Sequence, residues 1–113
     1  MNGHDDVRTA RFRAMILEDA ENELAWFSLG QALFEAGRFA DALDAFAAAS
    51  GLQADLMMAQ LRRAECLVEL GRHAEARGFA EKARALAIAQ HHEGPREDAD
   101  ELLEQIADAL DGG

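Results

Sequence analysis

The chain repeats one short pattern, and the spacing of the two copies restricts its fold more than any other feature. "EAGRFADAL" occupies residues 35–43, and "ELGRHAEAR" occupies residues 69–77, an offset of 34. The glycine–arginine pair at 37–38 aligns with the pair at 71–72. Glycine tolerates a positive φ, and it commonly ends a helix for that reason. The sequence therefore predicts two similar units, each a pair of helices joined by a tight turn.

Composition favours helices along the whole chain. Half of the 113 residues are hydrophobic, only 6% are aromatic, and there is one proline. Much of the hydrophobic half is alanine, which has the highest helix propensity. We predict an all-α fold of about six helices, over residues 5–19, 22–36, 39–50, 55–70, 73–90 and 95–110.

The first unit closely resembles the tetratricopeptide repeat family, whose units are 34 residues long and follow the pattern W-x2-L-G-x2-Y, then G, A, F and A. The matching positions are Trp26, Leu29, Gly30, Leu33 (in place of tyrosine), Gly37, Ala42, Phe46 and Ala49. The second unit departs from the pattern at Gln60, Arg63 and Ala64. It keeps Leu67, Gly71, Ala76, Ala80 and Ala83.

This resemblance implies a right-handed α-solenoid of antiparallel helix hairpins. Residues 1–113 would form a single domain that ends in a capping helix with a one-sided apolar stripe. Its parts would be a half-repeat helix at 5–19, repeat one at 22–55, repeat two at 56–89 and the C-terminal capping helix at 95–110.

Charge and the absence of an apolar span restrict the classes of partner. The chain has 22 acidic and 11 basic residues and a formal net charge of −11. Such a surface repels nucleic acid and anionic membranes, so we expect neither as a partner. The first ten residues lack the apolar stretch of a signal peptide, and no segment reaches the ~20 apolar residues of a membrane span. We expect a cytoplasmic protein.

No motif indicates catalysis or metal binding. The chain has no glycine-rich phosphate loop and no nucleophile elbow, and its many carboxylates are scattered over helix faces. His91 and His92 are adjacent and so lack the i, i+4 spacing of a helical metal site. Cys66 is the only cysteine and lies in an apolar helical pattern, which predicts a buried side chain. We expect no enzymatic activity, no cofactor and no metal.

In the family the first helix of each hairpin lines a concave groove, and the resemblance therefore implies a binding surface. Its positions would be Leu24, Phe27, Gln31, Phe34, Glu35, Met58, Leu61, Arg62, Glu65, Val68 and Glu69. Some family members hold a partner's terminal carboxylate with lysines and asparagines of the groove. Here Phe27 and Gln31 stand at such places in the first unit, and Leu61 and Glu65 in the second, so this clamp is absent. An apolar groove rimmed by glutamates suits a protein or peptide that is apolar and carries basic residues. We predict a protein–protein interaction module.

Two questions stay open from the sequence. Phe27 and Phe34 lie on a second apolar stripe beside that of Trp26, and they either pack inside the chain or line an open groove. The helix at 5–19 is also apolar enough to pair with a second copy through Phe12, Met15 and Ile16. The alternative function is therefore a self-assembling structural subunit, either a homodimer or a scaffold.

Overall fold

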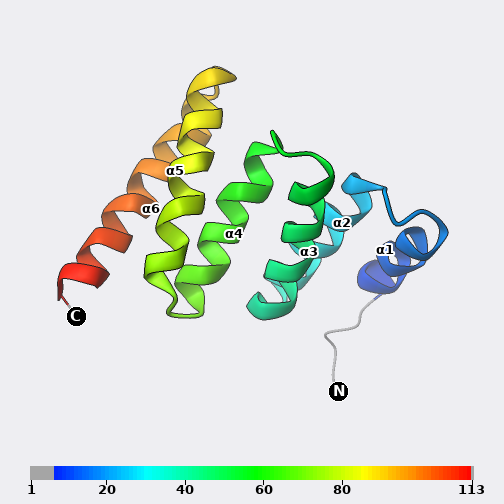
Figure 1. Cartoon of the computed structure of the whole chain (residues 1–113). Coiled ribbons are helices and arrows are strands. Elements are labelled where there is room, and N and C mark those ends of the chain that lie inside the picture. The colour runs from blue at the N-terminus through cyan, green and yellow to red at the C-terminus, as the bar shows by residue number, and fades with distance from the viewer. Residues whose placement is uncertain (1–6, 113) are drawn as a thin grey trace.

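The computed structural model describes residues 7–112, and these residues form helices joined by short corners, with no strand. This confirms the predicted all-α class (Figure 1). The predicted start of the first helix at Asp5 lies outside the described residues. The helices are α1 (Val7–Glu18), α2 (Glu23–Glu35), α3 (Phe39–Leu52), α4 (Met57–Glu69), α5 (His73–Ala89) and α6 (Glu93–Gly112).

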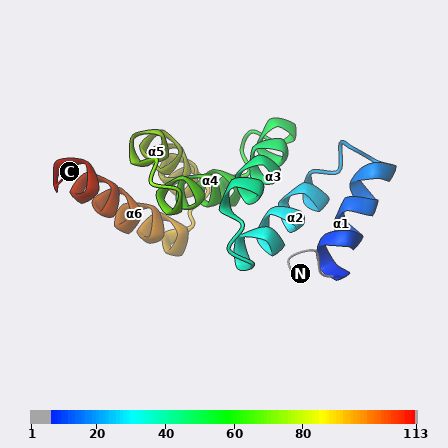
Figure 2. The ribbon, with the colours of Figure 1, turned by 90° about the horizontal axis from the view of Figure 1, so that it is seen from below.

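The helices stack in chain order as a solenoid of antiparallel hairpins, as predicted. α2 packs on α3 and α4 packs on α5, while α1 and α6 cover the two ends of the array. Figure 2 shows α3 and α5 toward one side of the array and α2 and α6 toward the other. An ion pair between Arg84 of α5 and Asp100 of α6 joins the last two helices. The described chain measures 42 × 34 × 20 Å.

The two glycine corners have the same geometry. Gly37 and Gly71 each have φ +77°. The amide of Gly37 donates to the carbonyl of Phe34 at 3.0 Å, and the amide of Arg38 donates to the carbonyl of Leu33 at 2.9 Å. The second corner repeats both bonds at 3.0 and 2.8 Å. Each pair of bonds forms a Schellman motif, so the two hairpins turn in the same way.

A third corner has this geometry without glycine, and the sequence did not reveal it. His91 has φ +60°, and the amide of His92 donates to the carbonyl of Ala87 at 2.8 Å. As a result α6 begins at Glu93, two residues before the predicted start at Pro95. The proline still lies in the first turn, where amides have no partner within the helix.

The start of α4 has no side-chain cap. Leu56 precedes the helix and makes no side-chain cap bond. The carboxylate of Asp55, one residue earlier, accepts a hydrogen bond from the side chain of Gln53. The helix therefore depends on packing at this end.

The core consists of two apolar clusters, one in each hairpin. The first lies between α2 and α3 and includes Leu33 and the fully buried Phe46, while the second joins α4, α5 and α6. Leu43 of α3 packs against both clusters. A Cβ at Gly30 would lie 2.7 Å from the Phe46 ring, so this glycine permits close contact between α2 and α3.

Two glycine-to-alanine changes should have opposite effects on stability. Gly30→Ala would push the Phe46 ring out of place and should lower the free energy of unfolding by about 1–3 kcal/mol. Gly78→Ala is the matched control, because Gly78 is exposed within α5 and a Cβ added there would meet no atom within 4 Å. It should raise stability by about 1 kcal/mol. Urea unfolding of both variants measures the difference, and equal effects would contradict this packing.

Candidate functional site

One arginine links the facing sides of α2 and α4. The Nε of Arg62 donates to the side-chain oxygen of Gln31 at 2.9 Å, and its guanidinium also forms an ion pair with Glu65. The guanidinium carbon lies 5.6 Å from the ring centroid of Phe34. This set of contacts fixes how the first helices of the two hairpins lie beside each other.

Two adjoining hollows continue from this contact toward α6. The first has a volume of about 190 Å³ and is lined by Phe34, Glu65, Val68, Glu69, Leu102 and Gln105. The second has a volume of about 390 Å³ and is lined by Glu65, Asp98, Glu101, Leu102 and Gln105. Because the two hollows share three residues, they form one depression, which we refer to as the groove.

The groove combines an apolar base with an acidic rim. Phe34, Val68 and Leu102 provide apolar surface from three different helices. The carboxylates of Glu65, Glu69, Asp98 and Glu101 surround it, and no basic residue lines either hollow among the described residues. The nearby Arg62 is neutralised by its pair with Glu65. The rim of the groove therefore carries negative charge around a small apolar base.

Only some of the predicted surface residues meet in the groove. Phe34, Glu65, Val68 and Glu69 line it, and Gln31 and Arg62 border it. Leu61 is 1% exposed and belongs to the second core cluster, so it is not accessible to a ligand. Met58 is half-buried against the same cluster.

The remaining predicted positions on α2 lie away from the groove. Leu24 is 67% exposed and lines neither hollow. The carboxylate of Glu35 forms an ion pair with Arg8 of α1 at 3.0 Å, which directs it to the end of the array.

The two phenylalanines of the second stripe on α2 are both half-buried, with rings packed on α3. The Phe27 ring centroid lies 5.4 Å from that of Phe46, and the Phe34 centroid lies 5.2 Å from that of Phe39. Of the two, only Phe34 also lines the groove. Both rings thus pack within the first hairpin. Phe34 also leaves part of its ring exposed to the groove.

Sequence reasoning missed the contribution of α6. Asp98, Glu101, Leu102 and Gln105 complete the groove, but we expected this helix only to cap the array. Leu102 is part of the apolar stripe of α6, and the acidic residues beside it have the pattern of a solvated helix face. Because α6 packs on α5, the side of α6 that carries Asp98, Glu101 and Leu102 lies next to α4. The sequence does not indicate this packing.

The predicted pairing surface on α1 is divided between core and solvent. Phe12 and Ile16 are half-buried against the first core cluster. Met15 is 37% exposed, and its neighbour Leu17 is 88% exposed. The exposed apolar surface of α1 therefore centres on Leu17 more than on the residues predicted.

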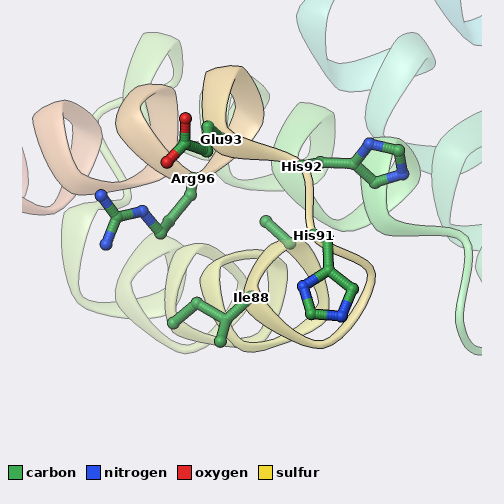
Figure 3. Close-up of a pocket in the computed structure, with 6 residues that line it drawn as sticks. Ile88, His91, His92, Glu93 and Arg96 are labelled. Carbon is green, nitrogen blue, oxygen red and sulfur yellow. The ribbon is translucent and has the colours of Figure 1, made fainter.

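The histidine corner forms a separate, open hollow of about 590 Å³ (Figure 3). Ile88, His91, His92, Glu93 and Arg96 line it, and the two imidazoles extend from the corner in different directions. Within residues 7–112, no group of three or more histidine, cysteine, aspartate or glutamate side chains is arranged to hold a metal ion. No helix in this range is long and apolar enough to cross a membrane.

Stacked antiparallel hairpins with equal corners define a helical-repeat protein. The family model described as "Tetratricopeptide repeat" matches residues 4–56 and again residues 29–91. These matches together span most of the chain, which therefore belongs to the tetratricopeptide repeat family. No curated protein matches the sequence significantly.

Solved structures share this fold. PcrH from Pseudomonas aeruginosa, in complex with the chaperone-binding region of PopD, is 26% identical, with a TM-score of 0.83 over 88% of this chain and 75% of that chain. The Yersinia enterocolitica type III secretion chaperone SycD, in complex with a peptide of the translocator YopD, is 21% identical, with a TM-score of 0.82 over 88% and 76%. The TPR2B domain of yeast Sti1, in a complex with pHsp70, is 20% identical, with a TM-score of 0.79 over 88% of this chain and 79% of that chain.

The single cysteine, Cys66, lies in α4 within the first core cluster and should report on folding through its ionisation. Burial, with a contribution from Glu65, raises the pKa of the Cys66 thiol from its ordinary 9.0 to about 12. In the unfolded chain the thiol loses its proton first, so the free energy of unfolding should fall between pH 9 and 12. The slope should reach at most about 1.4 kcal/mol per pH unit. Comparison with Cys66→Ala isolates this effect, and parallel pH profiles would contradict it.

Proposed function

We propose that this chain is a non-enzymatic protein-interaction module, an adaptor that binds a segment of a partner protein in the groove between α2, α4 and α6. The observation that carries the proposal is the meeting of Phe34, Val68 and Leu102 inside a ring of carboxylates. The likeness to PcrH, whose complex contains a chaperone-binding region, supports a peptide-like ligand. The family resemblance, which implies a concave surface lined by the first helix of each hairpin, adds further support.

The lining of the groove also supports a particular chemistry for the partner. An apolar side chain can cover the half-buried ring of Phe34, whereas Val68 and Leu102 are each only 9% exposed and add little apolar area. Lysine or arginine beside it would face Glu69, Asp98 and Glu101. Those rim charges contribute more to orientation and association rate than to affinity, and the contribution weakens as salt screens it. The ligand is therefore an apolar helix or extended segment with basic residues at its edges.

Charge reversal on α6 tests this function. Asp98→Lys with Glu101→Lys changes the rim, while Glu97→Lys with Glu104→Lys makes the same charge change at exposed positions of α6 outside both hollows. Immobilised protein should capture partners from extract of the native cells, and quantitative mass spectrometry measures them. The rim variant should lose partners at least about tenfold relative to the original chain, because its lysines repel the basic segment. The control variant should keep them.

Two results would contradict the groove. The first is equal loss of partners in both variants, which would indicate a dependence on net charge alone. The second is undiminished capture by the rim variant with an unchanged melting temperature. Thermal melts of both variants exclude unfolding as the cause of a loss.

The alternative function, self-assembly, is favoured by the exposed apolar surface of α1. Leu17 is 88% exposed and Val7 is 75% exposed at the end of the array. Sedimentation velocity separates the two functions. A self-assembling subunit would form a dimer that Leu17→Glu dissociates, whereas the adaptor should remain a monomer at about 100 µM, above the Kd of a typical specific dimer.

A further inference from the structure

One side chain of the protein itself occupies a place in the groove that suits a basic side chain of a ligand. The guanidinium of Arg62 lies against the Phe34 ring and forms an ion pair with Glu65. The side chains of Arg62 and Glu65 are 25% and 26% exposed, so solvent and salt screen this pair less than a pair on the open surface. Glu65 lines both hollows of the groove, and its charge is therefore neutralised from within the chain.

The other carboxylates of the rim have no such cation. Glu69, Asp98 and Glu101 are exposed, and within residues 7–112 no side chain forms an ion pair or a hydrogen bond with their carboxylates. Glu69 lines the hollow next to Phe34, whereas Asp98 and Glu101 both line the hollow next to α6. Unpaired negative charge is therefore greater in the hollow next to α6.

The internal repeat explains why only one side of the groove has its own arginine. At an offset of 34, Arg62 corresponds to Arg96 of α6, and Glu65 corresponds to Ala99. Ala99 offers Arg96 no carboxylate one turn further along the helix, and Arg96 lines the histidine hollow instead (Figure 3). Among the residues that the structure describes, the α6 side of the groove therefore has no internal cation.

Apolar surface has the opposite distribution. The half-buried Phe34 ring lines only the hollow on its own side, and in the hollow next to α6 the apolar contribution of Leu102 is small because this residue is 9% exposed. Arg62 already takes the position from which a ligand cation would interact with the Phe34 ring, and it would repel a second cation there. The hollow next to Phe34 therefore favours an apolar group, and the hollow next to α6 favours a cation.

We propose that Arg62 sets the orientation of the ligand in the groove. It holds the cation place beside Phe34 and Glu65, so the ligand's apolar side chain enters the hollow next to Phe34. The ligand's basic side chain enters the hollow next to Asp98 and Glu101. This inference rests on the proposed function of the groove and adds the direction in which a partner segment lies between α2 and α6.

Spin-labelled peptides test the orientation. The probe is the synthetic peptide acetyl-Leu-Leu-Ala-Lys-Lys-amide, prepared in two forms with a nitroxide at either its leucine end or its lysine end. Each form is added to the isotope-labelled full chain, and the nitroxide broadens the amide NMR signals closest to it. The leucine-end label should broaden signals of α2 around Phe34. The lysine-end label should broaden signals of α6 around Asp98 and Glu101.

Removal of Arg62 should give a result that the loss of a merely structural residue would not give. Arg62→Ala frees Glu65 and one face of Phe34 for the peptide's lysines. The peptide should therefore bind about threefold to tenfold more tightly, and each label should broaden signals of both α2 and α6. Loss of a residue that only supports the fold would weaken binding. Arg62→Gln, which also removes the charge, should give the same result and replaces Arg62→Ala if that variant unfolds.

Two further variants serve as controls. Arg62→Lys keeps the positive charge and should keep the single orientation. Arg77→Ala removes the same charge from an exposed position on α5 that lines neither hollow, so it should change neither the orientation nor the affinity.

Two results would overturn the proposal and leave the groove as the binding site. The first is broadening of both α2 and α6 by each label in the original chain. The second is a single orientation, or weaker binding, in folded Arg62→Gln. Broadening confined to α3 and α5, or no binding of the peptide, would contradict the proposed function of the groove as well.

Discussion

The structure depends on the left-handed backbone of its helix corners. Gly37 and Gly71 share one φ value and one pair of hydrogen bonds, so both hairpins close with the same geometry. Identical hairpins can stack with a constant offset, and each then buries the apolar face that its neighbour leaves open. Gly30 also supports close packing, inside the first hairpin, because it lets α2 approach the Phe46 ring. The groove follows from this stacking, since no single hairpin contains it.

The groove is a product of the stacked array, because its side chains lie on separate helices and form one surface only when those helices pack together. The apolar base of the groove comes from three helices, with Phe34 on α2, Val68 on α4 and Leu102 on α6. These residues meet only because the helices stack side by side. Arg62 of α4 contacts Gln31 and Phe34 of α2 and pairs with Glu65, and these contacts fix α2 and α4 relative to each other. A groove assembled in this way presents apolar and acidic groups from separate helices on one surface.

Local signals in the sequence predicted the helices and both glycine corners. The corner at His91 was missed because a non-glycine residue adopts positive φ there, which local pattern does not indicate. The site was predictable only in part. Phe34, Glu65, Val68 and Glu69 follow from repeat register, whereas Leu61 is buried because α4 is packed between α3, α5 and α6. The contribution of Asp98 and Glu101 depends on how α6 packs, a tertiary property that its apolar stripe does not specify.

The most direct test of this account is hydrogen–deuterium exchange of the chain alone and in complex with its captured partner. Exchange at backbone amides reports which helices a ligand stabilises. The account predicts that protection concentrates in α4, in α6 and in the part of α2 around Phe34. Protection confined to α3 and α5, on the other side of the array, would contradict it.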